Sequence, residues 1–113
     1  MRFHLKKMLS DLGVKRVQTA ATMEEAQLVL MVEVVDVIVC DWYLNMASGL
    51  DLLREVRKKV ENNRTAFLMV TAENTKEKVI EALKAGVDDY LVKPISTATM
   101  SAKISAALER RSK

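Results

Sequence analysis

Three short runs of apolar residues constrain the fold more than any other feature of this sequence. They alternate with segments of helical spacing, and each run is followed by a single polar residue. The runs are Val37–Cys40, Ala66–Val70 and Tyr90–Val92, and the residues that follow them are Asp41, Thr71 and Lys93. A run without polar alternation is typical of a strand covered on both faces, and strands that alternate with helices indicate a parallel sheet. We therefore expect an α/β domain, with a parallel sheet and helices on both of its faces.

The segments between these runs carry the signals of helix ends. Thr22 and Glu25 form a capping box, in which a hydroxyl and a carboxylate satisfy free backbone amides. Thr75 precedes a later helix in a comparable way, and Gly86 stands where a left-handed residue would end that helix. Apolar residues at helical spacing predict helices at Leu5–Leu12, Met23 to about Val32, Leu50–Val60, Val79–Leu83 and Met100–Leu108. One more strand is predicted at Val14–Ala20.

Length and composition predict one domain over residues 1–113. Half of the 113 residues are hydrophobic and 29% are charged, which is an ordinary globular balance. The lone cysteine, Cys40, excludes an internal disulfide framework and fits a cytoplasmic location. The longest apolar stretch, Leu28–Cys40, contains two acidic residues and is too short to span a membrane. The net charge is +3 with both signs interleaved, so we expect neither a nucleic-acid nor a membrane partner.

The three polar residues that follow the runs should converge. Parallel strands end at one edge of a sheet, and ligands bind at that edge in open α/β folds. Taken singly, Asp41 could cap a loop, Thr71 could satisfy a loop amide and Lys93 could be solvated. Together, a carboxylate, a hydroxyl and an ammonium suit phosphoryl transfer to the carboxylate, with Asp41 as the nucleophile. Thr71 and Lys93 would then bind phosphoryl oxygens, and Mg²⁺ would assist as a cofactor.

These residues lie in motifs that resemble the receiver domains of bacterial response regulators, most of all those that act alone in chemotaxis. The motifs are Asp41-Trp42, Met69–Glu73 and Val92–Ser96, and the likeness runs from Met1 to about Leu108. It implies two-component phosphorelay signalling, in which a histidine kinase or a small-molecule phosphodonor phosphorylates Asp41. It implies that the backbone carbonyl at Tyr43 helps Asp41 to hold the metal. It further implies a downstream protein target, and no enzyme activity beyond weak self-dephosphorylation.

The resemblance also implies a switch and a partner face. Thr71 would move toward the phosphoryl group, and the ring of Tyr90 would rotate into the vacated space. The alternative for Tyr90 is a half-buried ring with a hydrated hydroxyl. The residues implied on or near the partner face are Lys76, Val79, Tyr90, Val92 and Lys103. The Lys93–Pro94 bond is cis in the family, and an X-Pro bond is the context in which cis costs little.

The sequence departs from the family in one large respect. The family's first strand and its acidic pair have no counterpart before Met1, so Asp41 is the only obvious carboxylate and Mg²⁺ binding is expected to be weak or absent. Loss of that strand would expose two sheet edges, which predicts a rearranged sheet or a strand-exchanged homodimer. Val34 and Val35 replace the small residues expected at a turn, and they suggest a longer helix or strand.

A smaller departure concerns Tyr43, which stands where the family has a small polar residue. Its ring is predicted to restrict water and to slow hydrolysis of an acyl phosphate. The main alternative function is a degenerate or truncated receiver that binds a protein without being phosphorylated. A flavodoxin-like cofactor binder is disfavoured because no phosphate-cradling loop follows an early strand. A hydrolase is disfavoured because His4 has no nucleophile spaced for it.

Overall fold

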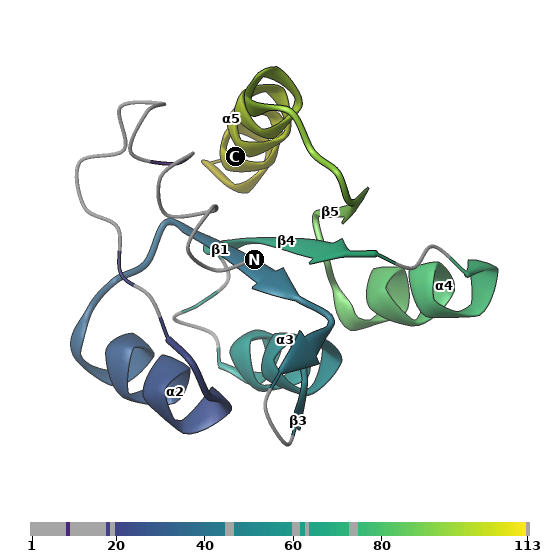
Figure 1. Ribbon diagram of the computed structural model, residues 1–113. Helices are drawn as coiled ribbons and strands as arrows, with labels where there is room; N and C mark the ends of the chain where they lie inside the picture. The colour runs from purple at the N-terminus through teal and green to yellow at the C-terminus, as the bar shows by residue number, and fades with distance from the viewer. Residues whose placement is uncertain are drawn as a thin grey trace.

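The protein folds around a three-stranded parallel sheet (Figure 1). This computed structural model describes Leu9, Gln18 and residues 20–44, 47–59, 62, 64–72 and 75–112. The strands are β1 (Val37–Asp41), β4 (Ala66–Thr71) and β5 (Asp89–Val92), and β4 lies in the middle. In the register, Asp41 is opposite Val70 and Thr71 is opposite Val92. The carboxyl ends of all three strands therefore meet at one edge.

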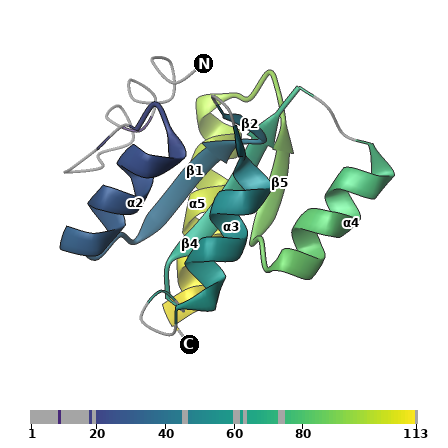
Figure 2. The ribbon, with the colours of Figure 1, turned by 90° about the horizontal axis from the view of Figure 1, so that it is seen from below.

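Helices cover both faces of this sheet, which confirms the expected fold class. They are α2 (Met23–Val32), α3 (Gly49–Lys58), α4 (Lys76–Ala85) and α5 (Thr97–Ser112). In Figure 1, α5 lies on one face of the sheet, and the other three helices lie on the opposite face. Figure 2 shows α2 and α4 at opposite margins of the sheet, beside β1 and beside β5 respectively.

The core divides into two layers because side chains alternate along β4. Phe67 and Met69 pack with α3 on one face, whereas Leu68 and Val70 pack with α5 on the other. Every residue of β4 is buried, so this strand carries the centre of both layers.

The predicted helix ends are largely confirmed. The hydroxyl of Thr22 accepts a hydrogen bond from the backbone amide of Glu25, and Thr75 accepts one from Lys78 in the same way. The carboxylate of Glu25 reaches back to the amide of Ala21, one residue earlier than an ideal capping box requires. Gly86 ends α4 with φ of 98°, a left-handed conformation that favours glycine.

The structure corrects two expectations about the strands. Of the three strands predicted to be covered on both faces, only β4 is fully buried. β1 is mostly half-buried, and Val92 of β5 is exposed. The reason is position, since β5 is an edge strand and β1 pairs only with β4 among the described residues. The segment after Asp41, expected to be a loop, contains an antiparallel pair of two short strands, β2 (Tyr43–Leu44) and β3 (Ala47–Ser48).

The predicted extension at Val34 and Val35 is wrong. α2 ends at Val32, β1 begins at Val37, and neither valine belongs to a helix or a strand. The helix ends there because its C-cap residue, Glu33, adopts an extended backbone conformation. The described strands also keep the simple order β1-β4-β5, so this part of the sheet is not rearranged.

The predictions at the N-terminus fall mostly outside the described residues. Of the helix expected at Leu5–Leu12, Leu9 alone is described, and it is helical. Of the strand expected at Val14–Ala20, Gln18 and Ala20 are described, and neither is in a strand. His4 lies outside the described residues.

Candidate functional site

The centre of the site is a direct contact between two of the predicted residues. Asp41 is the last residue of β1, and Lys93 directly follows β5 on the far side of β4. The Nζ atom of Lys93 lies 2.6 Å from Oδ2 of Asp41, and their side chains are 26% and 22% exposed. A charge-assisted contact across the full width of the sheet confirms that these strand ends converge.

Thr71, the third predicted residue, lies on the strand between the other two. It ends β4, and its side chain is completely buried. Its backbone carbonyl accepts a hydrogen bond of 2.8 Å from the amide of Lys93. The three residues therefore occupy adjacent strand ends, and the side chains of Asp41 and Lys93 are in direct contact.

The other carboxylate oxygen of Asp41 also has a donor. Its Oδ1 atom accepts a hydrogen bond of 3.1 Å from the backbone amide of Tyr43. The neighbouring Cys40 thiol is buried, and this burial, together with the charge of Asp41, raises its pKa to about 12. Cys40 is thus protonated at neutral pH, and a protonated thiol is a poor nucleophile.

The described residues do not by themselves complete a metal site. Among them, no group of three or more His, Cys, Asp or Glu side chains could hold a metal ion. Asp41 supplies one carboxylate and the backbone of Tyr43 one carbonyl, whereas Mg²⁺ requires six oxygen ligands. The described donors are therefore fewer than Mg²⁺ needs, and weak binding stays a prediction.

An aromatic cluster joins the site to α4. The rings of Trp42 and Tyr90 meet edge to face, with centroids 6.3 Å apart. Lys78 of α4 lies over two rings, 5.5 Å from the centroid of Trp42 and 4.7 Å from that of Tyr43. Its ammonium also donates a hydrogen bond to the hydroxyl of Tyr43. Trp42 and Tyr43, the two residues after Asp41, are therefore in direct contact with α4 through Lys78.

Gly49 sets the distance between this segment and the sheet. A Cβ atom at position 49 would lie 2.3 Å from the carbonyl oxygen of Asp41, which is far inside contact distance. The amide of Gly49 donates to the carbonyl of Trp42 at 2.5 Å, and Ser48 caps α3 by accepting from the amide of Asp51. The start of α3 thus packs closely against the end of β1.

The residues predicted for a partner face lie together on α4, β5 and α5. Lys76 and Val92 are exposed, and Val79 and Tyr90 are half-buried. Lys103 of α5 is paired at 3.1 Å with Asp89 of β5. Figure 2 shows that α4 lies next to β5, and Tyr90 of β5 belongs both to this face and to the aromatic cluster.

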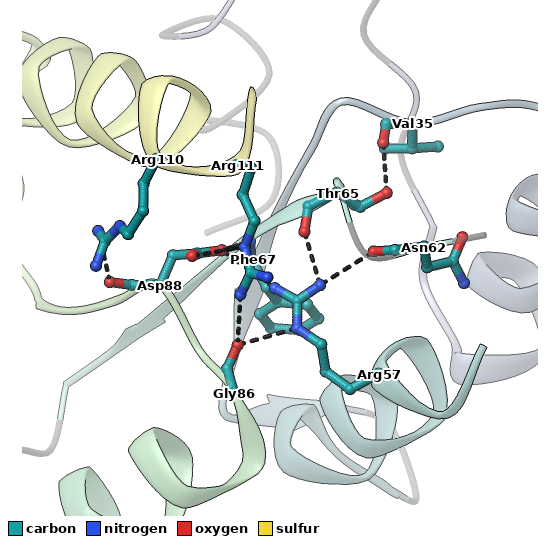
Figure 3. Close-up of polar contacts among 9 residues, drawn as sticks. All are labelled: Val35, Arg57, Asn62, Thr65, Phe67, Gly86, Asp88, Arg110 and Arg111. Carbon is teal, nitrogen blue, oxygen red and sulfur yellow. Dashed lines mark hydrogen bonds and ion pairs between the residues drawn. The ribbon is translucent and has the colours of Figure 1, made fainter. Parts of the chain in front are cut away.

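Sequence reasoning missed a second polar cluster at the opposite edge of the sheet (Figure 3). Asp88, just before β5, has a side chain that is only 2% exposed. Its carboxylate accepts hydrogen bonds from the backbone amide of Phe67 and from the guanidinium groups of Arg57 and Arg111, at 2.8 to 3.1 Å. Arg110 donates to the backbone carbonyl of Asp88.

Arg57 extends this cluster into the surrounding loops. It donates to the carbonyls of Gly86, Asn62 and Thr65, at 3.0, 3.2 and 2.8 Å. Burial and the charge of Arg111 lower its pKa, and Asp88 partly opposes that shift. The only sequence signal was the acidic pair Asp88-Asp89 before an apolar run, because the pairing with Arg57 spans 31 residues. The buried carboxylate of Asp88 is paired with two arginines, which indicates a structural role for this edge.

None of the helices in the described part of the chain has the length and apolar character needed to cross a bilayer.

Comparisons with known proteins agree with this geometry. The family described as "Response regulator receiver domain" matches residues 1–105. The chain is 38% identical to the chemotaxis protein CheY-3 of Vibrio cholerae over 110 residues, which are 97% of this chain and 85% of that protein. It is 37% identical to the chemotaxis protein CheY of Pseudomonas aeruginosa over 110 residues, 97% of this chain and 89% of that one.

The fold also matches solved structures. The Vibrio cholerae chemotaxis protein CheY4 superposes with a TM-score of 0.87 at 30% identity, covering 95% of this chain and 88% of that one. The match confirms the parallel sheet and the helices on its two faces.

Proposed function

The chain belongs to the receiver domains of response regulators, which act in two-component phosphorelay signalling, and on this premise we propose that Asp41 is its phosphoacceptor. Receiver domains are phosphoacceptor signalling domains and not classical enzymes. The observation that carries the proposal is the contact of 2.6 Å between Asp41 and Lys93 at the carboxyl edge of the sheet. It holds the partly exposed carboxylate of Asp41 next to a cation, at the carboxyl edge of the sheet.

The chemistry follows from the groups present. One carboxylate oxygen of Asp41 attacks the phosphorus of the donor and forms an acyl phosphate, and the leaving group departs with the electron pair of the broken bond. Lys93 neutralises charge on the phosphoryl oxygens, and the amide of Tyr43 holds the other carboxylate oxygen. Thr71 would donate its hydroxyl to a phosphoryl oxygen. The donor would be a histidine kinase or a small phosphorylated molecule.

We assign no step to a metal ion, because the described residues offer it too few ligands. Receiver domains generally use Mg²⁺ at this site. In this chain Mg²⁺ would bind weakly through Asp41, the carbonyl of Tyr43, and the oxygens of water and the donor's phosphate. Its effect would be to offset negative charge near the phosphoryl group.

The output is a change in affinity for a downstream protein. Thr71 and Tyr90 would form the switch, and the face containing Lys76, Val79 and Val92 would bind the target. What supports this route is the contact chain from the Asp41 segment through Trp42 and Lys78 to α4. The domain would work in the cytoplasm, where phosphodonors are available.

Intact mass spectrometry tests the phosphoacceptor. The chain is incubated with a small phosphodonor, with and without Mg²⁺, and compared with Asp41→Asn. Asp89→Asn is a matched control, because Asp89 is also a partly exposed acid paired with a lysine. We expect an increase of one phosphoryl group in the parent and in Asp89→Asn, but not in Asp41→Asn. Labelling that persists in Asp41→Asn, or is absent from the parent chain, would contradict the proposal.

A further inference from the structure

Helix α2 is apolar on two opposite sides, although no residue of it is buried. Met23, Ala26 and Leu30 pack against the core. Leu28 and Met31, on the outer side, are 63% and 72% exposed. A helix that is hydrophobic all round is normally enclosed by other structure. Among the residues that the structure describes, none covers the outer side of α2, although its composition calls for cover.

The outer residues form one continuous surface, which we call the α2 patch. It consists of Leu28, Met31, Val32 and Val34, and the last two are 80% and 94% exposed. Leu28, Met31 and Val32 follow the i, i+3, i+4 spacing that places side chains on one face of a helix. Exposed apolar patches of this kind commonly mark a protein contact.

The neighbouring helix shows that this exposure is unusual within the fold. α3 buries its leucines and turns Asp51, Arg54 and Lys58 to solvent. The other large apolar side chains that are exposed on described helices, Ile80 and Leu83, belong to α4 at the opposite margin of the sheet. That margin is the face already proposed for the downstream target, so the α2 patch requires a different partner.

Two hollows beside the patch provide room for side chains of that partner. They have volumes of about 210 and 390 Å³, and both are lined by Leu30, Met31 and Lys59. The larger hollow also includes Val32 and Val34. The patch thus combines protruding side chains with neighbouring hollows. In helix contacts, side chains of one helix pack into such grooves of the other.

The charges around the patch favour a second copy of the same chain. Glu24 and Glu25 occupy the first turn of α2, whereas Lys59, the C-cap of α3, lines the hollow at the far end of the patch. If two α2 helices pack antiparallel about a two-fold axis, the acidic turn of each lies near Lys59 of the other. The opposed helix dipoles add to this attraction, so the surface is complementary to itself, as a two-fold contact requires.

The exposed area of the α2 patch limits the affinity of such a dimer. Four side chains exposed to this degree present on the order of 500 Å² per copy, so the contact would bury about 1,000 Å² in total, near the lower limit for a specific interface. We propose that the outer face of α2 is the contact surface for a second copy of this chain, packed antiparallel as a weak two-fold dimer. The expected dissociation constant is on the order of 10–100 µM. This dimer leaves the α4–β5–α5 face free.

Sedimentation equilibrium of the full chain, from low to several hundred micromolar, tests the proposal. We expect the average mass to rise from monomer to dimer, and Met31→Glu to abolish the rise. Leu83→Glu is the matched control, since it puts the same charge on an exposed apolar residue of α4. A parent chain that is monomeric throughout would overturn the proposal. So would a dimer that survives Met31→Glu, or a mass that grows beyond two copies.

A charge exchange tests the antiparallel arrangement without changing the apolar patch. Glu24→Lys and Lys59→Glu should each weaken the dimer several-fold, because each places like charges together across the axis. The double variant should restore the parent affinity. Single effects that the double variant does not reverse would overturn this arrangement. Circular dichroism melting curves establish that each variant is folded, which the exposure of all four substituted residues leads us to expect.

Discussion

Two aspartates lie at opposite edges of the same sheet, and each contacts a basic side chain. Asp88, at the amino edge, is 2% exposed and accepts from two arginines and a backbone amide. Asp41, at the carboxyl edge, is 22% exposed and has one lysine and one amide as partners. The first carboxylate is saturated and enclosed by rigid donors. The second is held by a single flexible cation and remains accessible to a reagent.

The difference shows how one fold places a stabilising carboxylate at one edge of the sheet and a carboxylate available for chemistry at the other. A buried carboxylate is tolerated only when every lone pair has a partner, and that same saturation removes its reactivity. An accessible carboxylate beside one cation remains hydrated when that cation shifts to a phosphoryl oxygen, so the shift costs little free energy. The comparison predicts that equivalent substitutions at the two edges act on different properties, stability at one edge and chemistry at the other.

The largest effect is expected for Asp88→Asn. The substitution keeps the shape but leaves Arg57 and Arg111 facing each other without a counter-charge, which should lower the free energy of unfolding by about 3–5 kcal/mol. The matched change Asp41→Asn removes only a partly exposed pair, and it should alter the free energy of unfolding by less than about 1 kcal/mol. Urea denaturation followed by circular dichroism measures both. Equal losses would show that the two edges do not differ in this way.

The next effect concerns chemistry at the open edge. Lys93→Met removes the cation that neutralises the phosphoryl oxygens, and it should slow labelling by a small phosphodonor roughly 10²-fold. The rate of the mass increase at fixed donor concentration measures this. Lys103→Met is the control, because Lys103 also forms a partly exposed pair with an aspartate, at 3.1 Å, and should label like the parent chain. An unchanged rate in Lys93→Met would remove Lys93 from the mechanism.

The smallest effect is expected at Tyr43, beside Asp41. Its ring is held against α4 by Lys78, and we expect it to limit the access of water to an acyl phosphate. Tyr43→Asn should therefore speed the loss of the phosphoryl group several-fold, followed by intact mass over time after the donor is removed. Lys78→Met keeps the ring but frees it from α4, and it should have a smaller effect. A rate that does not change in Tyr43→Asn would show that the ring does not shield the site.

The open edge was predictable from the sequence, because its geometry follows from strand order. Each apolar run ends in a polar residue, and parallel strands bring such ends together, so Asp41 and Lys93 could be paired across 52 residues. The cap at Thr22 and the left-handed Gly86 were predictable for a similar reason, since local chemistry decides them.

The closed edge was not predictable, because nothing local distinguishes its members. Arg57 and Arg111 are basic residues on helices, and such residues are usually solvated. Only the tertiary fold brings them to Asp88, 31 and 23 residues away. The exposure of α2 escaped prediction as well, since an apolar helix face indicates burial and not whether this chain or another provides the cover.

Gly49 carries a consequence for how this sequence can vary. Any other residue would place a carbon atom 2.3 Å from the backbone oxygen of Asp41, and backbone cannot yield as a side-chain tip can. A saturation library screened for signalling should therefore accept almost nothing at position 49. A residue with no chemical role is thus required by the position of one backbone oxygen next to the proposed phosphoacceptor.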